Sequence, residues 1–211
     1  MIIVPGWALR CGNGPASEWR LWLAGFAHAG YAQDEVEVFG GDRCQPNEQL
    51  AAQLGDEVDR VLARTGAAKI DLIAHSMGAL PARWCVTFGS CAGKVANVVT
   101  LSGANHGTAL AAFCPLQFWS KACSDMTPGS PMLAALNSGD ETPDDAHWET
   151  FVSVCELVIW PRTSAELAGA DNHDLTDRCV PHDDWKVDAP TVDHVVGELA
   201  GAGVDVNPGP G

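Results

Sequence analysis

The stretch Lys69-Ile-Asp-Leu-Ile-Ala-His-Ser-Met-Gly78 decides the fold of this chain. Its first six residues are mostly apolar and predict a buried strand, and residues 79–86 predict a helix directly after it. Ser76 stands between the two, with the small residues Ala74 and Gly78 two positions before and after it. Small residues at these positions permit a strained strand–turn–helix connection, the nucleophile elbow, which exposes the serine hydroxyl at the start of the helix.

The segments on either side alternate between strand and helix patterns. Strands are predicted at 1–4, 35–39, 95–101, 151–154 and 157–159, and helices after Ser17, from about Asn47 to Gly66 and from about Pro190 to Leu199. Strands and helices in this order predict an α/β fold with a mostly parallel open sheet, covered by helices on both faces. Such sheets bind ligands at the carboxyl ends of their strands, which is where Ser76 is expected.

The chain has 211 residues, a length that suits one domain. We expect this domain to span residues 1–203 and a flexible tail to follow at 204–211. Residues 107–145 contain four prolines and interrupt the strand–helix rhythm, so we expect them to form an excursion above the sheet. This segment is too short and too rich in proline to form a large cap domain.

The charge balance argues against several classes of partner. Twelve Lys and Arg residues stand against 27 Asp and Glu residues, and the resulting formal charge of -15 repels nucleic acid. The sequence has no apolar run of about 18 residues that could span a bilayer. We expect a monomer without a nucleic-acid partner or an integral membrane segment.

Cysteine is abundant in the chain. The eight cysteines form no Cys-x-x-Cys pair and their spacing fits no zinc site, so disulfides are the better interpretation. Disulfides form in oxidising compartments, and we therefore expect a secreted protein. The chain begins Met-Ile-Ile-Val-Pro-Gly, without the basic and apolar regions of an export signal, and we expect it to be a mature form.

An exposed serine becomes a nucleophile only when a base accepts its proton and a carboxylate orients that base. In folds with a nucleophile elbow, the acid and then the histidine follow the serine along the chain. The candidates for the base that follow Ser76 at or beyond the excursion are His147, His173, His182 and His194.

Two motifs carry a resemblance to a known family. Ala74-His-Ser-Met-Gly78 and the segment Lys94–Thr108, which ends in Asn-His-Gly-Thr, resemble the small secreted lipases of the Bacillus type. Those enzymes belong to the class 2 lipase group of α/β-hydrolases, and a cysteine-bearing actinobacterial branch is the closer likeness. The resemblance covers nearly the whole chain and is strongest between residues 65 and 108. It implies a minimal α/β-hydrolase fold without a large cap.

The resemblance also assigns the base and the acid. Cys179-Val-Pro-His182 falls where the family carries its catalytic histidine, after the last strand and before the C-terminal helix. Glu156 falls on the position of the acid, where the relatives usually carry Asp. Because of this departure, alternatives for the acid stay open at Asp171, Asp174 and Asp177.

Two backbone N–H groups are needed to hold the oxyanion that forms during ester hydrolysis. The elbow supplies the N–H of Met77. The relatives carry His-Gly-x after their first strand, and the matching Pro5-Gly6-Trp7 assigns the second donor to Trp7. Trp7 and Trp185 flank an inferred donor and the inferred base, and we expect them to wall a substrate groove.

The resemblance implies two of the disulfide pairings, Cys114 with Cys123 and Cys155 with Cys179. Sequence proximity then suggests Cys85 with Cys91, which leaves Cys11 with Cys44. A bridge from Cys155 to Cys179 would tie the segment of the acid to the loop that carries His182.

These patterns predict a secreted serine carboxylic ester hydrolase, a lipase or esterase, that forms an acyl-enzyme and needs no cofactor or metal. An open groove lined by aromatic residues also suits a polyester or polyhydroxyalkanoate depolymerase with the same triad. The hypothesis from another class is a non-catalytic binding protein with a hydrolase fold.

Overall fold

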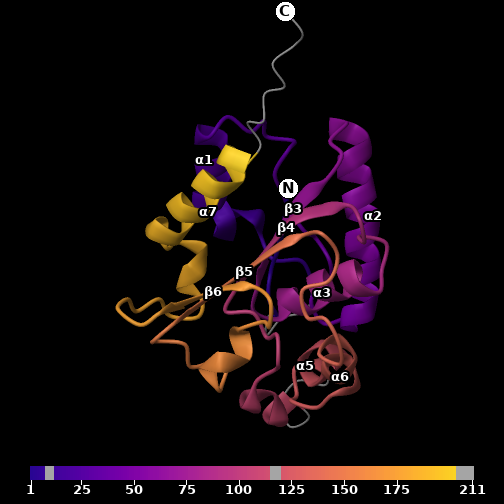
Figure 1. The fold of residues 1–211 in the computed structure, drawn as a ribbon, viewed down its shortest axis with the longest axis vertical. Helices are drawn as coiled ribbons and strands as arrows, with labels where there is room; N and C mark the ends of the chain where they lie inside the picture. Colours follow the sequence, from indigo (N-terminus) through magenta and orange to yellow (C-terminus); the bar gives the residue numbers. More distant parts are fainter. Residues whose placement is uncertain (8–11, 115–119, 203–211) are drawn as a thin grey trace, which may run out of the picture.

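In the computed structural model, which describes residues 1–7, 12–114 and 120–202, six parallel strands form one sheet in the order β2-β1-β3-β4-β5-β6 (Figure 1). The strands are β1 Ile2–Val4, β2 Glu37–Val38, β3 Ile70–His75, β4 Val95–Leu101, β5 His147–Ser153 and β6 Asp171–Leu175. Parallel pairing brings the carboxyl ends of all these strands to one edge of the sheet. The expected open parallel sheet is confirmed.

Helices cover both faces of the sheet. In Figure 1, α2 and α3 lie on one side, and α1 and α7 lie on the other and contact each other. The α-helices are α1 Arg20–His28, α2 Asn47–Thr65, α3 Ala79–Thr87, α5 Lys121–Asp125, α6 Pro131–Leu136 and α7 Ala189–Ala202. Short 3-10 turns are η1 Ala16–Trp19, η2 Ser76–Gly78, η3 Ala109–Phe113, η4 Arg162–Ala165 and η5 Asp184–Lys186.

The longest helix, α2, illustrates how the sequence pattern produces this packing. Its apolar residues recur every three or four positions, and Leu50, Leu54 and Val58 are buried on one face. The helix ends at Gly66, which adopts the left-handed conformation with φ of 71° and donates its N–H to the carbonyl of Leu62. Glycine takes this conformation without steric penalty, so it stops the helix at the predicted position.

The two faces of the sheet carry separate cores. One cluster combines apolar residues of β1, β3 and β4 with those of α2 and α3. The other combines Ile3, Ile73, Val99 and Phe151 with apolar residues of α1 and α7. Alternate residues of one strand point to opposite faces, which is why neighbouring strand residues divide between the two clusters.

The described part of the segment 107–145 contains the short helices η3, α5 and α6 and no large cap. α5 contacts α2, and α6 contacts α3. These helices lie together at the bottom of Figure 1. Residues 115–119 of this segment lie outside the described residues, as does the predicted tail at 204–211.

One predicted strand is wrong. Residues 157–159 are irregular, and Leu157 is 72% exposed although the run is apolar. The last strand is β6, Asp171–Leu175, whose sequence Asp-Asn-His-Asp-Leu is polar because the strand lies at the edge of the sheet. An edge strand needs little apolar burial, so hydrophobic patterning does not find it.

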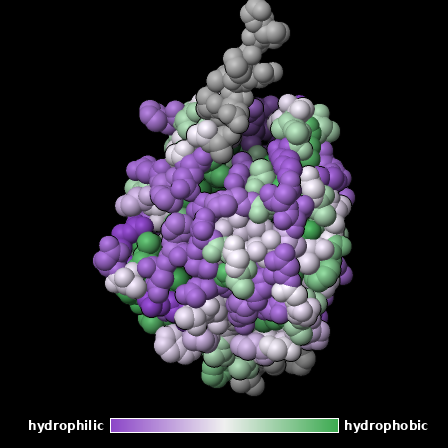
Figure 2. All heavy atoms as spheres, in the orientation of Figure 1, coloured by the Kyte–Doolittle hydropathy of each residue, from purple (hydrophilic) through white to green (hydrophobic). Residues whose placement is uncertain are grey.

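The visible face of the molecule is largely hydrophilic. Figure 2 shows a face on which hydrophilic side chains predominate and apolar ones are scattered. Among the described residues, no helix has the length and apolar character to cross a membrane.

Candidate active site

Ser76 occupies a sharp turn between β3 and α3. Its φ of 57° lies in the left-handed region that side chains other than glycine rarely adopt. The turn packs closely against the loop after β1: a Cβ at Gly78 would lie 2.4 Å from the carbonyl oxygen of Val4, and one at Gly6 would lie 2.7 Å from the Cβ of Ser76. The glycines are therefore needed for the turn to form.

The side chains of Ser76, His182 and Glu156 are in line. Nε2 of His182 lies 2.9 Å from the hydroxyl oxygen of Ser76. On the other side of the ring, Nδ1 lies 3.0 and 3.1 Å from the two carboxylate oxygens of Glu156. These are hydrogen-bond distances, and they pair the elbow serine with the histidine and the acid that the resemblance assigns.

Glu156 is held in a buried polar setting in the turn after β5. Its Oε1 accepts the backbone N–H groups of Val158 at 2.7 Å and of Ile159 at 2.8 Å. Burial raises the pKa of Glu156, but hydrogen bonding to His182, the charge of His182, and hydrogen bonds from Ser102 and Ile159 outweigh this effect, so the pKa lies below its ordinary value. The carboxylate is thus kept ionised.

Two of the three other candidates for the acid point elsewhere. Asp171 contacts His147 at 2.9 Å, and Asp174 pairs with Arg162 at 2.9 Å. Neither contacts His182, so Glu156 is the better supported of these three carboxylates.

His75 supports the loop that carries His182. Its buried Nε2 lies 2.8 Å from the backbone carbonyl oxygen of His182, and the two rings pack with centroids 4.8 Å apart. Burial first, and then the charge of His182, lower the pKa of His75 to about 3. The ring is therefore neutral above about pH 3, and it donates its Nε2–H to the carbonyl.

A pocket of about 470 Å³ opens beside Ser76. Its lining contains an apolar group, from η3, α5 and the turn after Glu156, and a charged group. The apolar group includes Leu110, Ala111, Phe113, Met126, Val158 and Ile159, and the charged group includes Glu18, Arg43, Asp183 and Lys186.

Trp7 and Met77, the assigned oxyanion donors, adjoin the serine. Trp7 lines the pocket, and its indole Nε1 donates to Ser120 Oγ at 3.2 Å. Met77 directly follows Ser76 in η2, and its side chain is buried.

The expectation that Trp185 walls the groove is wrong. Its side chain is completely buried in the core beside α1 and α7, and its indole Nε1 donates to Ser102 Oγ at 2.8 Å. A tryptophan can pack in the core with its indole N–H hydrogen-bonded, or it can line a binding groove at the surface. Sequence alone does not separate these two roles.

The structure contains disulfides between Cys85 and Cys91, Cys114 and Cys123, and Cys155 and Cys179, which are three of the four expected pairs. Cys44 is disulfide-bonded, whereas Cys11 lies outside the described residues. The bridge from Cys155 to Cys179 joins the turn that carries Glu156 to the loop that carries His182.

Sequence analysis missed three residues of the site. Arg43 lines the pocket, and its Nη1 lies 3.4 Å from the carbonyl oxygen of Gly6. Thr108 also lines the pocket, and its hydroxyl accepts the N–H of Trp160 at 3.1 Å. Ser102 bonds to Trp185 from a strained backbone with φ of 43°. Ser102 and Thr108 lie in the motif region of the resemblance, whereas no sequence signal marks Arg43.

The described residues hold one group of side chains suited to a metal ion. It consists of Glu149, His173 and His194, and none of the three lines the pocket.

Comparisons with known proteins identify the family of the chain. The model of the family Lipase (class 2) matches residues 1–189. A triacylglycerol lipase of Pseudomonas fragi is 32% identical over 106 residues, which cover 47% of this chain and 36% of that protein. The match thus spans about a third of that curated relative.

Solved structures show the same fold. A Bacillus licheniformis lipase in its mature form superposes with a TM-score of 0.73 at 16% identity, covering 94% of this chain and 90% of that one. Lipase B of Aspergillus fumigatus gives a TM-score of 0.66 at 16% identity, covering 82% and 43%. With an α/β-hydrolase sheet, an elbow serine and a family match over nearly its whole length, this chain belongs to the class 2 lipase family.

Proposed function

We propose that the protein is a secreted serine carboxylic ester hydrolase, a lipase or esterase. The observation that carries the proposal is the hydrogen-bonded line of Ser76, His182 and Glu156 at the edge of a largely apolar pocket. This is the arrangement that nucleophilic acyl transfer requires.

The reaction has two halves. Ser76 Oγ attacks the ester carbonyl while His182 Nε2 takes the hydroxyl proton, and His182 then gives that proton to the departing alcohol. The resulting acyl-enzyme is cleaved by water, which His182 activates in the same way. Glu156 accepts a hydrogen bond from Nδ1–H of His182 and stabilises the imidazolium that forms in each half.

The negative charge on the carbonyl oxygen needs hydrogen-bond donors. We assign this role to the backbone N–H groups of Met77 and Trp7. Met77 directly follows Ser76 in the chain, and Trp7 lines the same pocket as Ser76. Arg43 supports this loop through the carbonyl of Gly6. Removing one such donor costs about 3 kcal/mol of barrier, or roughly 100-fold in rate.

The apolar and the charged lining residues of the pocket suit the two parts of an ester. Leu110 and Phe113 would contact the acyl chain, because burying each methylene contributes about 0.8 kcal/mol. Glu18 and Lys186 are suited to the polar alcohol part. The disulfides agree with a protein that works outside the cell.

The test is hydrolysis of p-nitrophenyl esters from C2 to C16 by wild type, Ser76→Ala and Glu156→Gln. We expect kcat/KM to fall at least about 1,000-fold in Ser76→Ala, because the nucleophile is lost. Glu156→Gln should fall about 1,000-fold, because the amide no longer stabilises the imidazolium. Undiminished activity of a folded Ser76→Ala variant would contradict the mechanism.

A polyester depolymerase with the same triad is the second candidate. An apolar rim at the pocket favours it: Phe113 is 58% exposed and Trp160, which follows the pocket residue Ile159, is 54% exposed. Weight loss of a polyester film, compared with turnover of long-chain glycerides, separates the two. A non-catalytic binding protein would neither hydrolyse these substrates nor be labelled at Ser76 by a fluorophosphonate.

A further inference from the structure

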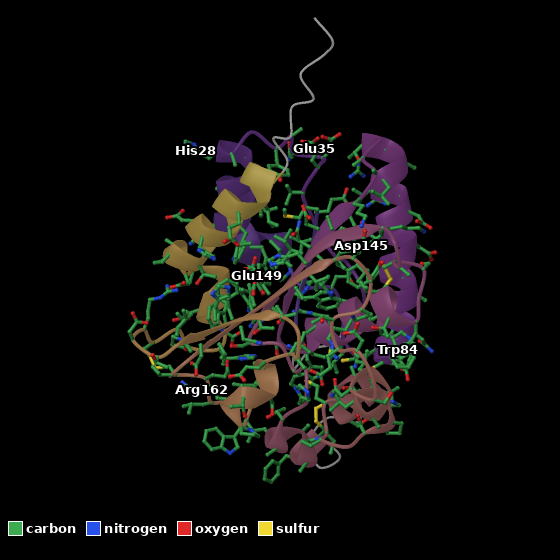
Figure 3. All side chains as sticks on the ribbon, in the orientation of Figure 1. His28, Glu35, Trp84, Asp145, Glu149 and Arg162 are labelled. Carbon is green, nitrogen blue, oxygen red and sulfur yellow. A yellow bond between two sulfur atoms is a disulfide. The ribbon has the colours of Figure 1, made fainter. Side chains whose placement is uncertain are left out.

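A second cluster of ionisable side chains lies away from the pocket, on the face of the sheet that packs against α7. Glu149 belongs to β5, His173 to β6 and His194 to α7. One ligand atom from each lies within 4.8 Å of the other two. Glu149 is labelled in Figure 3, beside the ribbon of α7.

Strand pairing explains why these residues meet. Phe151 is paired with His173 in the register of β5 and β6, so their side chains share one face of the sheet. The phenyl ring stacks on His173 with centroids 4.4 Å apart and meets His194 edge-on at 5.6 Å. It therefore orients both imidazoles, and Glu149 lies two residues earlier on the same face.

Glu149 is the most deeply buried member of the cluster, and burial together with a side-chain hydrogen bond to Glu198 raises its pKa to about 7. Its side chain is only 5% exposed, and its Oε2 accepts no hydrogen bond from the described residues. Nε2 of His173 lies 3.4 Å from this oxygen without hydrogen-bond geometry. A buried carboxylate oxygen without a donor is costly, and such groups in native proteins are usually paired or coordinate metals.

We propose that Glu149, His173 and His194 bind a divalent metal ion of the zinc class. The 3.4 Å between Nε2 and Oε2 is close to the roughly 3.3 Å that separates two ligands of a tetrahedral zinc ion with bonds of about 2.0–2.1 Å. Two imidazoles and one carboxylate select zinc, cobalt, nickel or copper, whereas calcium and magnesium take oxygen ligands.

Helix α7 offers a fourth ligand. Glu198 lies one turn after His194 on α7, and its Oε1 is 3.5 Å from Nε2 of His194. Its carboxylate can complete the tetrahedron or orient the imidazole of His194. The site then joins three elements, of which β6 is the edge strand and leads into the loop of His182. The role of the bound ion is structural: it holds β5, β6 and α7 together.

The experiment starts with wild-type protein stripped of metal by dialysis against EDTA. Titration with ZnCl2 should show one equivalent bound, and the melting temperature should rise by about 5 °C once free zinc is a hundredfold above Kd. CoCl2 should give the intense visible absorption of tetrahedral cobalt. CaCl2 should neither bind at one equivalent nor raise the melting temperature.

The variants Glu149→Gln and His194→Asn should bind zinc at least 100-fold more weakly. The side chain of His194 is 42% exposed, so its replacement leaves the core intact even if Glu149→Gln folds poorly. The control is His28→Asn, an exposed histidine on α1 that lies far from Glu149 in Figure 3. The proposal is overturned if wild type binds no zinc, or if His194→Asn binds it as tightly as wild type.

Discussion

At the scale of single residues, the candidate active site contains groups whose protonation is set by burial or by hydrogen bonds. His75 is the extreme case: it is buried, its ring holds the backbone of His182, and its pKa is about 3. Glu156 is the opposite case, because its hydrogen bonds hold the pKa below the ordinary value and keep the carboxylate charged. His182 is therefore flanked by a neutral ring, His75, and by an anionic carboxylate, Glu156.

His75 gives a prediction for stability against pH. The unfolded chain binds a proton at this residue below pH about 6.5, whereas the folded protein does not until pH about 3. Because the unfolded state binds more protons in this window, the free energy of unfolding falls as pH falls, by up to about 1.4 kcal/mol per pH unit. His75→Gln should flatten this slope.

The measurement is urea unfolding at pH 7, 6 and 5 for wild type, His75→Gln and the control His28→Gln, which replaces an exposed histidine. Wild type and the control should share the steeper slope. Equal slopes in all three proteins would mean that His75 has the same pKa in the folded and unfolded states, which would contradict the prediction.

At the scale of elements, the turns after β5 and β6 carry the acid and the base, and the bridge from Cys155 to Cys179 fixes their spacing. The sequence predicted β3, α2 and β4 closely, because burial imposes clear periods of two or 3.6 residues on them. It predicted the sites of Ser76 and His182 from motifs. It missed β6, a polar edge strand, and misplaced Trp185, since a pattern of apolar residues does not tell which face a side chain meets.

The bridge between Cys155 and Cys179 should matter for activity as well as for stability. Its loss as Cys155→Ser/Cys179→Ser should lower the free energy of unfolding by about 3 kcal/mol, because the closed segment is 24 residues long. It should also lower kcat/KM about 10-fold or more, since Glu156 and His182 lose their fixed spacing.

The matched control is Cys85→Ser/Cys91→Ser, in which a shorter loop of separation 6 is opened at the end of α3. This variant should lose stability but keep kcat/KM under conditions where it is folded. Thermal unfolding and p-nitrophenyl butyrate hydrolysis measure the two effects, and an equal loss of activity in both variants would contradict a positioning role.

At the scale of the whole molecule, the proposed catalytic residues lie at the carboxyl edge of the sheet, beside an apolar part of the pocket lining. Most of this apolar lining comes from the excursion at 107–145, whose η3 and α5 line the pocket. Chain-length preference should therefore depend largely on this segment.

Leu110→Asp tests that dependence. Leu110 lines the pocket and is 46% exposed, so a carboxylate there can fold but repels an alkyl chain. Activity on C12–C16 esters should fall about 10-fold relative to activity on C2–C4 esters. Leu157→Asp is the control, because Leu157 is exposed outside the pocket lining. The same shift in both variants would show that general surface charge is responsible.

The disulfides have a consequence for how the chain matures. The pairs Cys85–Cys91, Cys114–Cys123 and Cys155–Cys179 are separated by 6, 9 and 24 residues, and no pair encloses or crosses another. If the protein is secreted, as we propose, each of these cysteines meets its partner before the next pair emerges during export from the N-terminus onward. Oxidation in order of emergence should then give the native pairing, so we expect these three bridges to form without later reshuffling by an isomerase.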